Sequence, residues 1–178
     1  MKQLKDIKRI CNLGCGTMGF GTAIAFAQNG YEVNMFGRKD ASIARAMRNI
    51  HATLDVMKAN DLLTEAEEKE LLSHIHGVTS IEDAAKDADF VLESVAEDMD
   101  VKQYVYGELE KYLGPDVIFA TDSSGLLPTE VASVLKHPER FVVAHFWNPP
   151  HLIREKTGSS FERSSRIRRK PVTVCPAS

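Results

Sequence analysis

A glycine-rich hexapeptide at residues 14–19, Gly-Cys-Gly-Thr-Met-Gly, constrains the fold of this chain more than any other stretch. It follows a short apolar run at residues 7–13 and opens a helical pattern that ends before Gly30. Strand, glycine turn and helix in this order are typical of a dinucleotide-binding turn, in which the pyrophosphate lies on the helix N-terminus. In that motif the first glycine permits the tight turn, the second lets the backbone approach the phosphates, and the third lets helix and strand pack closely. The sequence therefore predicts cofactor contacts from Gly14, Gly16, Thr17, Met18 and Gly19.

The chain continues to alternate short apolar strand patterns with helical patterns. Strands are predicted at residues 7–13, 31–36, 78–79, 89–93, 117–120 and 140–144, and helices at 17–29, 41–59, 64–75, 81–87, 100–112 and 128–135. This alternation predicts an α/β fold of the Rossmann type, a doubly wound and mostly parallel sheet, in which residues 41–75 form a helical hairpin insertion capped at Thr64. Ligands of such sheets bind at the carboxyl ends of the strands, so the loops that follow the strands are expected to line the site.

The end of the second predicted strand bears on the choice of cofactor. NAD-binding folds usually carry a carboxylate there to hold the ribose 2′-hydroxyl, but this chain has Gly37-Arg38-Lys39-Asp40. Arg38 and Lys39 favour pairing with a 2′-phosphate, which would make the cofactor NADP. Asp40 has two interpretations, a ribose ligand or, preferably, the cap of the following helix. The sequence predicts NAD, with NADP kept open because of Gly37-Arg38.

Composition narrows the class of protein. The 178 residues are 43% hydrophobic and carry a formal net charge of −3, which favours neither nucleic acid nor a membrane surface as a partner. The three cysteines, Cys11, Cys15 and Cys175, form no paired framework and no metal-ligand spacing, so no metal is predicted and a reducing compartment is expected. No signal peptide and no bilayer-spanning run is evident, and we expect a cytoplasmic protein.

Several motifs beyond the glycine turn resemble one family. They are residues 87–93 (Asp-Ala-Asp-Phe-Val-Leu-Glu) leading to Glu97 and Lys102, residues 121–124 (Thr-Asp-Ser-Ser), Thr129-Glu130, and residues 145–149 (His-Phe-Trp-Asn-Pro). In this order and spacing, from about residue 7 to 153, they resemble the NAD-binding domain of the 3-hydroxyacyl-CoA dehydrogenases, enzymes of fatty-acid and butanoate metabolism. The family includes relatives that act on carnitine or sugar acids.

The resemblance implies roles for individual residues. His145, at the end of a predicted strand, would be the base that takes the hydroxyl proton of a secondary alcohol, because an imidazole does this reversibly near neutral pH. Ser124 would hydrogen-bond the substrate oxygen, and Asn148 would orient the site. Glu97 and Lys102 would contact the nicotinamide ribose, and Asp122 occupies a cofactor-side position where the family usually has asparagine. The hairpin of residues 41–75 would correspond to the insertion that contacts CoA.

The resemblance stops after Ile153, which gives two expected parts: a dinucleotide-binding domain at 1–153 and an atypical basic tail at 154–178 that ends in a possible strand. The family continues with a glutamate that orients the catalytic histidine and with a helical domain that completes the cleft. Here Glu155 lies in a charged run, and we expect that helical domain to be missing. Two hypotheses follow: an oxidoreductase domain that binds an acyl-CoA and depends on self-association or a separate helical partner, or a noncatalytic NAD(P)-binding remnant.

Overall fold

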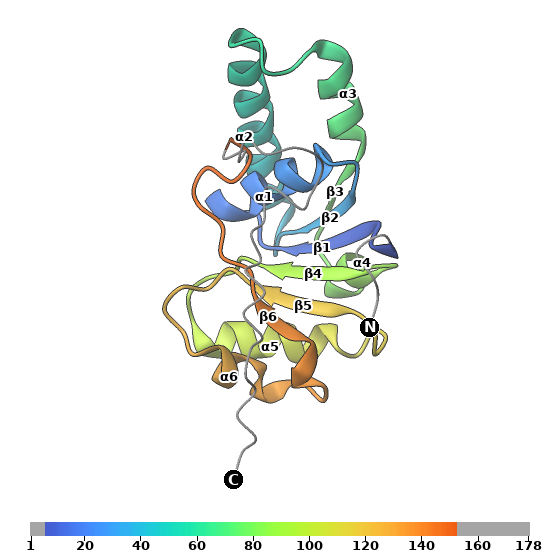
Figure 1. The fold of residues 1–178 in the computed structure, drawn as a ribbon, viewed down its shortest axis with the longest axis vertical. Helices are drawn as coiled ribbons and strands as arrows, with labels where there is room; N and C mark the ends of the chain where they lie inside the picture. The colour runs from blue at the N-terminus through green and yellow to red at the C-terminus, as the bar shows by residue number, and fades with distance from the viewer. Residues whose placement is uncertain (1–5, 153–178) are drawn as a thin grey trace.

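The computed structural model describes residues 6–152 and contains one six-stranded sheet in which all strands are parallel. The strands are β1 (Arg9–Leu13), β2 (Glu32–Phe36), β3 (Ile75–Val78), β4 (Phe90–Glu93), β5 (Ile118–Thr121) and β6 (Phe141–Val143). Their order across the sheet is β3-β2-β1-β4-β5-β6 (Figure 1). The chain therefore winds outward from β1 to one edge and then from β4 to the other, which confirms the predicted doubly wound Rossmann-like fold.

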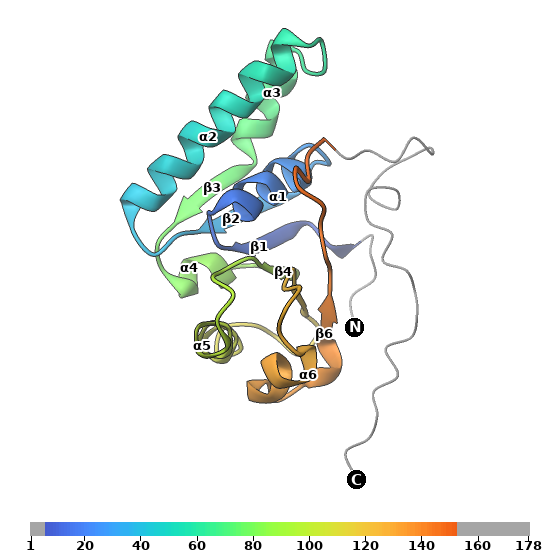
Figure 2. The ribbon, with the colours of Figure 1, turned by 90° about the vertical axis from the view of Figure 1, so that its left-hand side faces the viewer.

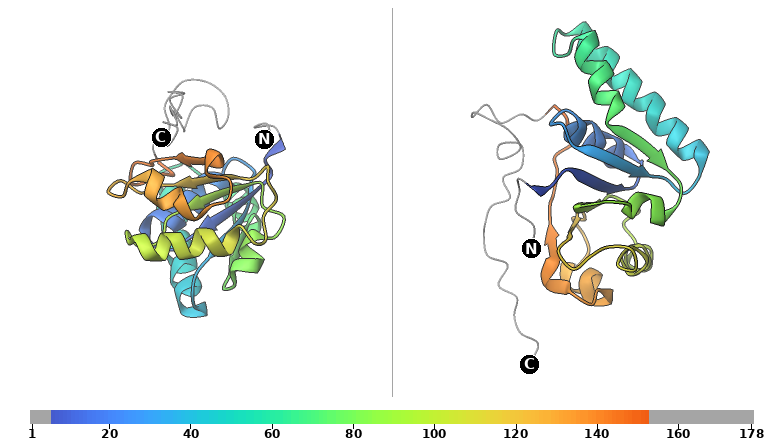
Figure 3. Two further views of the ribbon diagram at one scale, coloured as in Figure 1. Left: turned by 90° about the horizontal axis from the view of Figure 1, so that it is seen from below. Right: turned by 90° about the vertical axis from the view of Figure 1, so that its right-hand side faces the viewer.

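Helices cover both faces of this sheet (Figure 2). One face carries α1 (Thr17–Ala27), α2 (Asp40–Ala59) and α3 (Glu65–Ser73), and the other carries α4 (Ile81–Ala85), α5 (Met99–Leu109) and α6 (Pro128–Val131), with short 3₁₀ turns η2 (Ala132–Val134) and η3 (Pro138–Arg140). Because successive strand residues point to opposite faces, Ile10 joins the core under α1 while Cys11 joins the core under α5. In the left view of Figure 3, α5 lies across its face of the sheet.

The hairpin of α2 and α3 extends beyond the sheet (Figures 1 and 3). Thr64 caps α3 as predicted: its hydroxyl accepts a hydrogen bond from Glu67 N, and the Glu67 carboxylate accepts one from Thr64 N. An ion pair between Lys58 Nζ and Glu68 Oε2 joins the two helices at 2.5 Å. None of the helices in the described part is long and apolar enough to cross a membrane.

Two local predictions are wrong. The sheet-edge strand β3 spans residues 75–78 instead of 78–79, because α3 ends at Ser73 and His74 already accepts a ladder hydrogen bond from Val33 N. Asp40 does not cap α2: the N-cap is Lys39, whose side chain makes no capping bond, and Asp40 is the first helical residue. Its charge still favours the positive end of the helix dipole.

Candidate functional site

The turn after β1 has the shape that its glycines predict. Gly14 has a φ of +110°, and a Cβ there would lie 2.4 Å from Ser94 O. A Cβ on Gly19 would lie 2.1 Å from Gly14 O, so helix and strand touch through backbone atoms. A Cβ on Gly16 would meet nothing within 4 Å. Gly16 is also the N-cap of α1 and makes no side-chain capping bond, so the first N–H groups of the helix lack a side-chain cap, which fits a bound pyrophosphate.

A buried asparagine in β1, which our sequence analysis missed, holds this turn in place. The Asn12 amide nitrogen donates to Gly19 O at 2.8 Å and to Gly14 O at 3.3 Å, and its oxygen accepts from Thr22 Oγ1 at 3.0 Å. These bonds join β1, the turn and α1. The available signal was a lone polar residue between Cys11 and Leu13 in an otherwise apolar run.

Directly after β2, Gly37 has no room for a side chain. A Cβ there would lie 2.8 Å from both Cys15 Sγ and Ile43 Cδ1, so an acidic residue could replace this glycine only if its neighbours moved. Arg38 and its two successors are exposed. Burial raises the pKa of the Cys15 thiol, while the Arg45 guanidinium on α2 acts in the opposite direction. The carboxyl end of β2 therefore has exposed cations at Arg38 and Lys39 and no carboxylate at Phe36 or Gly37.

A buried ion pair lies at the carboxyl ends of β4 and β5. Glu93 and Lys102 both have fully buried side chains, and Lys102 Nζ donates to Glu93 Oε1 at 2.7 Å. Glu93 also accepts hydrogen bonds from Val95 N and from the hydroxyls of Thr121 and Tyr106. Lys102 is thus placed beside the predicted site, but its ammonium is enclosed between carboxylates.

Glu97 ties this pair to the loop after β5. Its carboxylate lies 3.4 Å from Lys102 Nζ and accepts hydrogen bonds from Ser123 Oγ at 2.5 Å and Gly125 N at 2.9 Å. Burial alone would raise the Glu97 pKa, but the hydrogen bonds from Ser123 and Gly125 and the nearby ammonium outweigh it and lower the pKa. Ser124, between those two partners, is exposed. Glu97 therefore fixes the backbone that presents the predicted substrate-binding hydroxyl.

Asp122 directly follows β5, next to this network. Its backbone N–H donates to Glu93 O at 3.0 Å. Burial raises the pKa of its carboxyl group, and the nearby Glu93 adds to that shift, whereas Ser94 and Lys102 oppose it. Oδ2 is buried and makes no hydrogen bond of normal geometry within residues 6–152.

His145 and Asn148 follow the neighbouring strand β6. Ala144 N donates to Thr121 O at 2.9 Å, so the loops that carry Ser124 and His145 start from paired positions of adjacent strands. Both His145 and Asn148 are exposed, and the imidazole packs edge-on against Trp147, itself 74% exposed. In the part of the chain that the structure describes, the imidazole makes no hydrogen bond to a carboxylate. Glu155, the nearest carboxylate in the sequence, and the basic tail lie outside the described residues.

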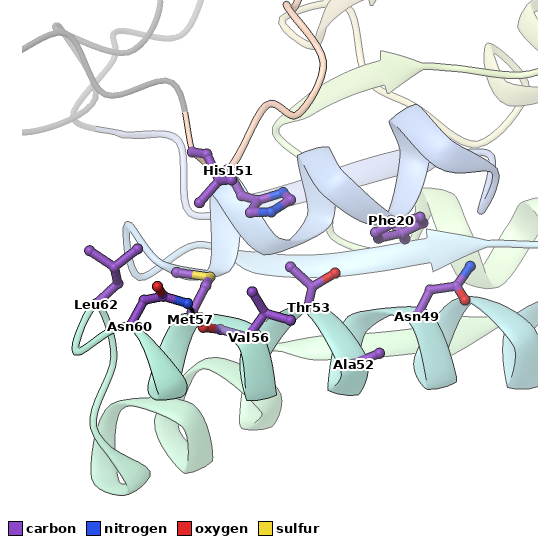
Figure 4. A pocket seen from close by; sticks show the side chains of 10 residues that line it. Phe20, Asn49, Ala52, Thr53, Val56, Met57, Asn60, Leu62 and His151 are labelled. Carbon is purple, nitrogen blue, oxygen red and sulfur yellow. Dashed lines mark hydrogen bonds between the residues drawn. The ribbon is translucent and has the colours of Figure 1, made fainter.

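A separate hollow lies between α1 and α2 (Figure 4). This groove of about 800 Å³ is bounded by Phe20 on α1, by the exposed Val56 and other residues of α2, and by His151 and Leu152. Sequence reasoning did not identify it, because it forms only where the loop after Asn148 returns to α1. Residues 6–152 hold no cluster of three or more His, Cys, Asp or Glu side chains suited to a metal ion.

Comparisons with known proteins agree with this geometry. Residues 9–155 match the family described as "3-hydroxyacyl-CoA dehydrogenase, NAD binding domain". The chain is 32% identical over 159 residues to 3-hydroxybutyryl-CoA dehydrogenase of Clostridioides difficile, covering 89% of this chain and 56% of that protein. It is 34% identical over 151 residues to L-carnitine dehydrogenase of Oceanobacillus iheyensis, covering 83% and 47%.

Among solved structures, (S)-3-hydroxybutyryl-CoA dehydrogenase from Ralstonia eutropha matches with a TM-score of 0.78 at 34% identity, over 82% of this chain and 51% of that one. The chain therefore spans about half the length of these relatives.

Proposed function

The chain belongs to the 3-hydroxyacyl-CoA dehydrogenase family through its NAD-binding domain, and from this membership we propose that it serves hydride transfer between a nicotinamide cofactor and the 3-hydroxyl of a 3-hydroxyacyl-CoA. The observation that carries the proposal is the glycine turn, where Gly14 and Gly19 touch and Gly16 faces open space at the N-terminus of α1. This arrangement fits a pyrophosphate, since N–H groups and the helix dipole both favour an anion there. In our proposal Thr17 and Met18 complete the turn that holds the cofactor.

Three further residues carry the proposed chemistry. When bound, a nicotinamide ring accepts or returns the hydride. His145 would take the hydroxyl proton on an imidazole nitrogen as the alcohol is oxidised and give it back in the reverse direction. Ser124 would donate a hydrogen bond to the substrate oxygen as charge develops there, and Asn148 would orient the substrate. The position of Ser124 and His145 on loops from adjacent strands supports this assignment.

For the cofactor, the family implies NAD(H). We propose NADP(H) as the alternative because Gly37 cannot be extended without displacing Cys15 and Ile43, while Arg38 is exposed beside it. Arg38→Ala tests the choice: if the guanidinium binds a 2′-phosphate, calorimetry should show weaker NADPH binding and unchanged NADH binding. Equal effects on both cofactors, or on neither, would exclude a phosphate contact by Arg38.

For the substrate and partners, the relatives leave more than one possibility, because they include enzymes named for carnitine as well as for acyl-CoA. We propose an acyl-CoA and a cytoplasmic setting. Exposed apolar side chains at the end of β6 and in the segment that follows, at Val143, Trp147 and Leu152, support a further proposal that this segment is covered by a second copy or by a helical partner. The second candidate function is a nucleotide-binding module without turnover, favoured by the lack of a carboxylate partner for His145 within the described range.

One experiment separates these functions. Purified protein is titrated calorimetrically with NADH and NADPH, and acetoacetyl-CoA is then added while the absorbance of the reduced cofactor is followed. The dehydrogenase proposal expects binding followed by cofactor oxidation, with His145→Gln retaining the binding and losing the oxidation. Binding without oxidation favours the noncatalytic module, and absence of binding refutes the assignment of the glycine turn.

A further inference from the structure

Asp122 is a half-buried carboxylate directly after β5, and one of its oxygens, Oδ2, is buried. It shares its surroundings with Glu93 on β4, with Glu97 on the loop that follows, and with Lys102 and Tyr106 on α5. Lys102 is the cation of this group, and its ammonium contacts Glu93 and Glu97 at 2.7 and 3.4 Å. This part of the site thus holds three carboxylates, two of which contact the one ammonium.

The negative charges of the other two carboxylates, Glu93 and Glu97, are compensated by hydrogen bonds, an ion pair or solvent. Glu93 accepts hydrogen bonds from Lys102, Val95 N and Thr121 Oγ1, and Glu97 accepts them from Ser123 and Gly125 and is 45% exposed to solvent. The Ser94 hydroxyl and the Lys102 ammonium offset the burial of Asp122 only in part, and its buried Oδ2 makes no hydrogen bond of normal geometry within residues 6–152. A partly buried charge with incomplete compensation is costly, so a cation placed beside it would be stabilised.

The position of Asp122 puts that charge on the nicotinamide side of the turn. Ser94 O packs against Gly14, and the neighbouring Asp122 backbone bonds to Glu93 at the ends of β5 and β4. A doubly wound sheet binds one mononucleotide over each half, across the point where the strand order reverses. The half formed by β4, β5 and β6 also carries Ser124 and His145, so the reacting ring belongs there.

We propose that Asp122 makes this site prefer the oxidised cofactor, because the nicotinamide ring is a cation when oxidised and neutral when reduced. This inference rests on the proposed cofactor function. The surplus negative charge would attract the oxidised ring and have little effect on the reduced one, so that at equal cofactor concentrations the protein would hold NAD⁺ more than NADH.

The test measures binding of both redox forms without substrate. Wild-type protein, Asp122→Asn and the control Glu82→Gln are titrated calorimetrically with NAD⁺ and with NADH. The asparagine keeps the side-chain shape and removes the charge, and the control removes the same charge from an exposed position on α4. We expect Asp122→Asn to reduce the ratio of NAD⁺ to NADH affinity by about tenfold, the order of one charge acting at short range in partly screened surroundings. Glu82→Gln should leave the ratio unchanged.

A second measurement does not depend on how the variant folds. Burial raises the Asp122 pKa, so acidification should neutralise this group before an ordinary aspartate and lower the affinity ratio of the wild-type protein, while Asp122→Asn shows a smaller change. An unchanged ratio in a folded Asp122→Asn protein, or a wild-type ratio that does not fall on acidification, would overturn the inference while leaving cofactor binding intact. Failure of the wild type to bind either form would instead refute the proposed function, and the inference with it.

Discussion

Replacing the turn glycines one at a time separates packing from cofactor binding. In Gly19→Ala the new methyl group would lie 2.1 Å from Gly14 O and 2.6 Å from Gly14 C, both backbone atoms that cannot rotate away. Overpacking of this kind costs about 1–3 kcal/mol. The higher helix propensity of alanine stabilises the folded protein by roughly 1 kcal/mol relative to glycine. Because the clash is with backbone, the cost lies at the upper end, and we expect a net loss of about 2 kcal/mol in the free energy of unfolding.

Two other glycines provide matched controls. In Gly16→Ala the methyl group meets nothing within 4 Å, so the stability of the free protein should stay within about 0.5 kcal/mol, while affinity for the cofactor should fall at least tenfold because the methyl occupies the phosphate space. Gly107→Ala on α5 also meets nothing, and it should stabilise the protein by roughly 0.5–1 kcal/mol. Gly19→Ala, in contrast, should lose both stability and binding.

Urea unfolding without cofactor, followed by circular dichroism, measures the stability of all three variants, and calorimetry with NADH measures binding. A Gly19→Ala protein as stable as Gly107→Ala would refute the close contact between helix and strand. A Gly16→Ala protein that binds NADH as tightly as the wild type would refute the placement of the pyrophosphate, whatever its stability.

Two further predictions concern charged groups. Lys102→Met leaves Glu93 buried without its cation and should cost about 3–5 kcal/mol in urea unfolding, whereas adding Glu93→Gln should recover a large part of that loss; no recovery would contradict the buried pair. Hydrogen bonds from His76 and then His74 lower the pKa of Glu32 in the folded state, so this group contributes stability above its unfolded pKa of about 4.3 that is lost as the pH falls through the folded value. The urea midpoint of the wild type should therefore fall more steeply than that of Glu32→Gln over this acidic range, and parallel curves would contradict the assignment.

The fold could be predicted from the sequence because its determinants are local. Alternating apolar runs, helical spacing and the glycines at 14, 16 and 19 each report the conformation of a few consecutive residues, and their order selects a doubly wound parallel sheet. The same locality explains the errors. The edge strand β3 is positioned by pairing with β2, and the N-terminus of α2 by tertiary contacts, so neither boundary is encoded in a short window.

The properties of the candidate site also fall into those that depend on local sequence and those that depend on tertiary structure. The sequence alone determined which residues follow the strand ends: the turn glycines, Glu97, Asp122, Ser124 and His145. Only the tertiary structure decided how far each of these residues is buried and how its charge is compensated, because both depend on residues far apart in the chain. It enclosed Lys102 between Glu93 and Glu97, buried Asp122 Oδ2 without a hydrogen bond of normal geometry, and used Asn12 to fix the turn. A pattern of residue types places a carboxylate at a strand end, but whether that carboxylate is neutralised, exposed or uncompensated depends on which side chains the fold brings beside it.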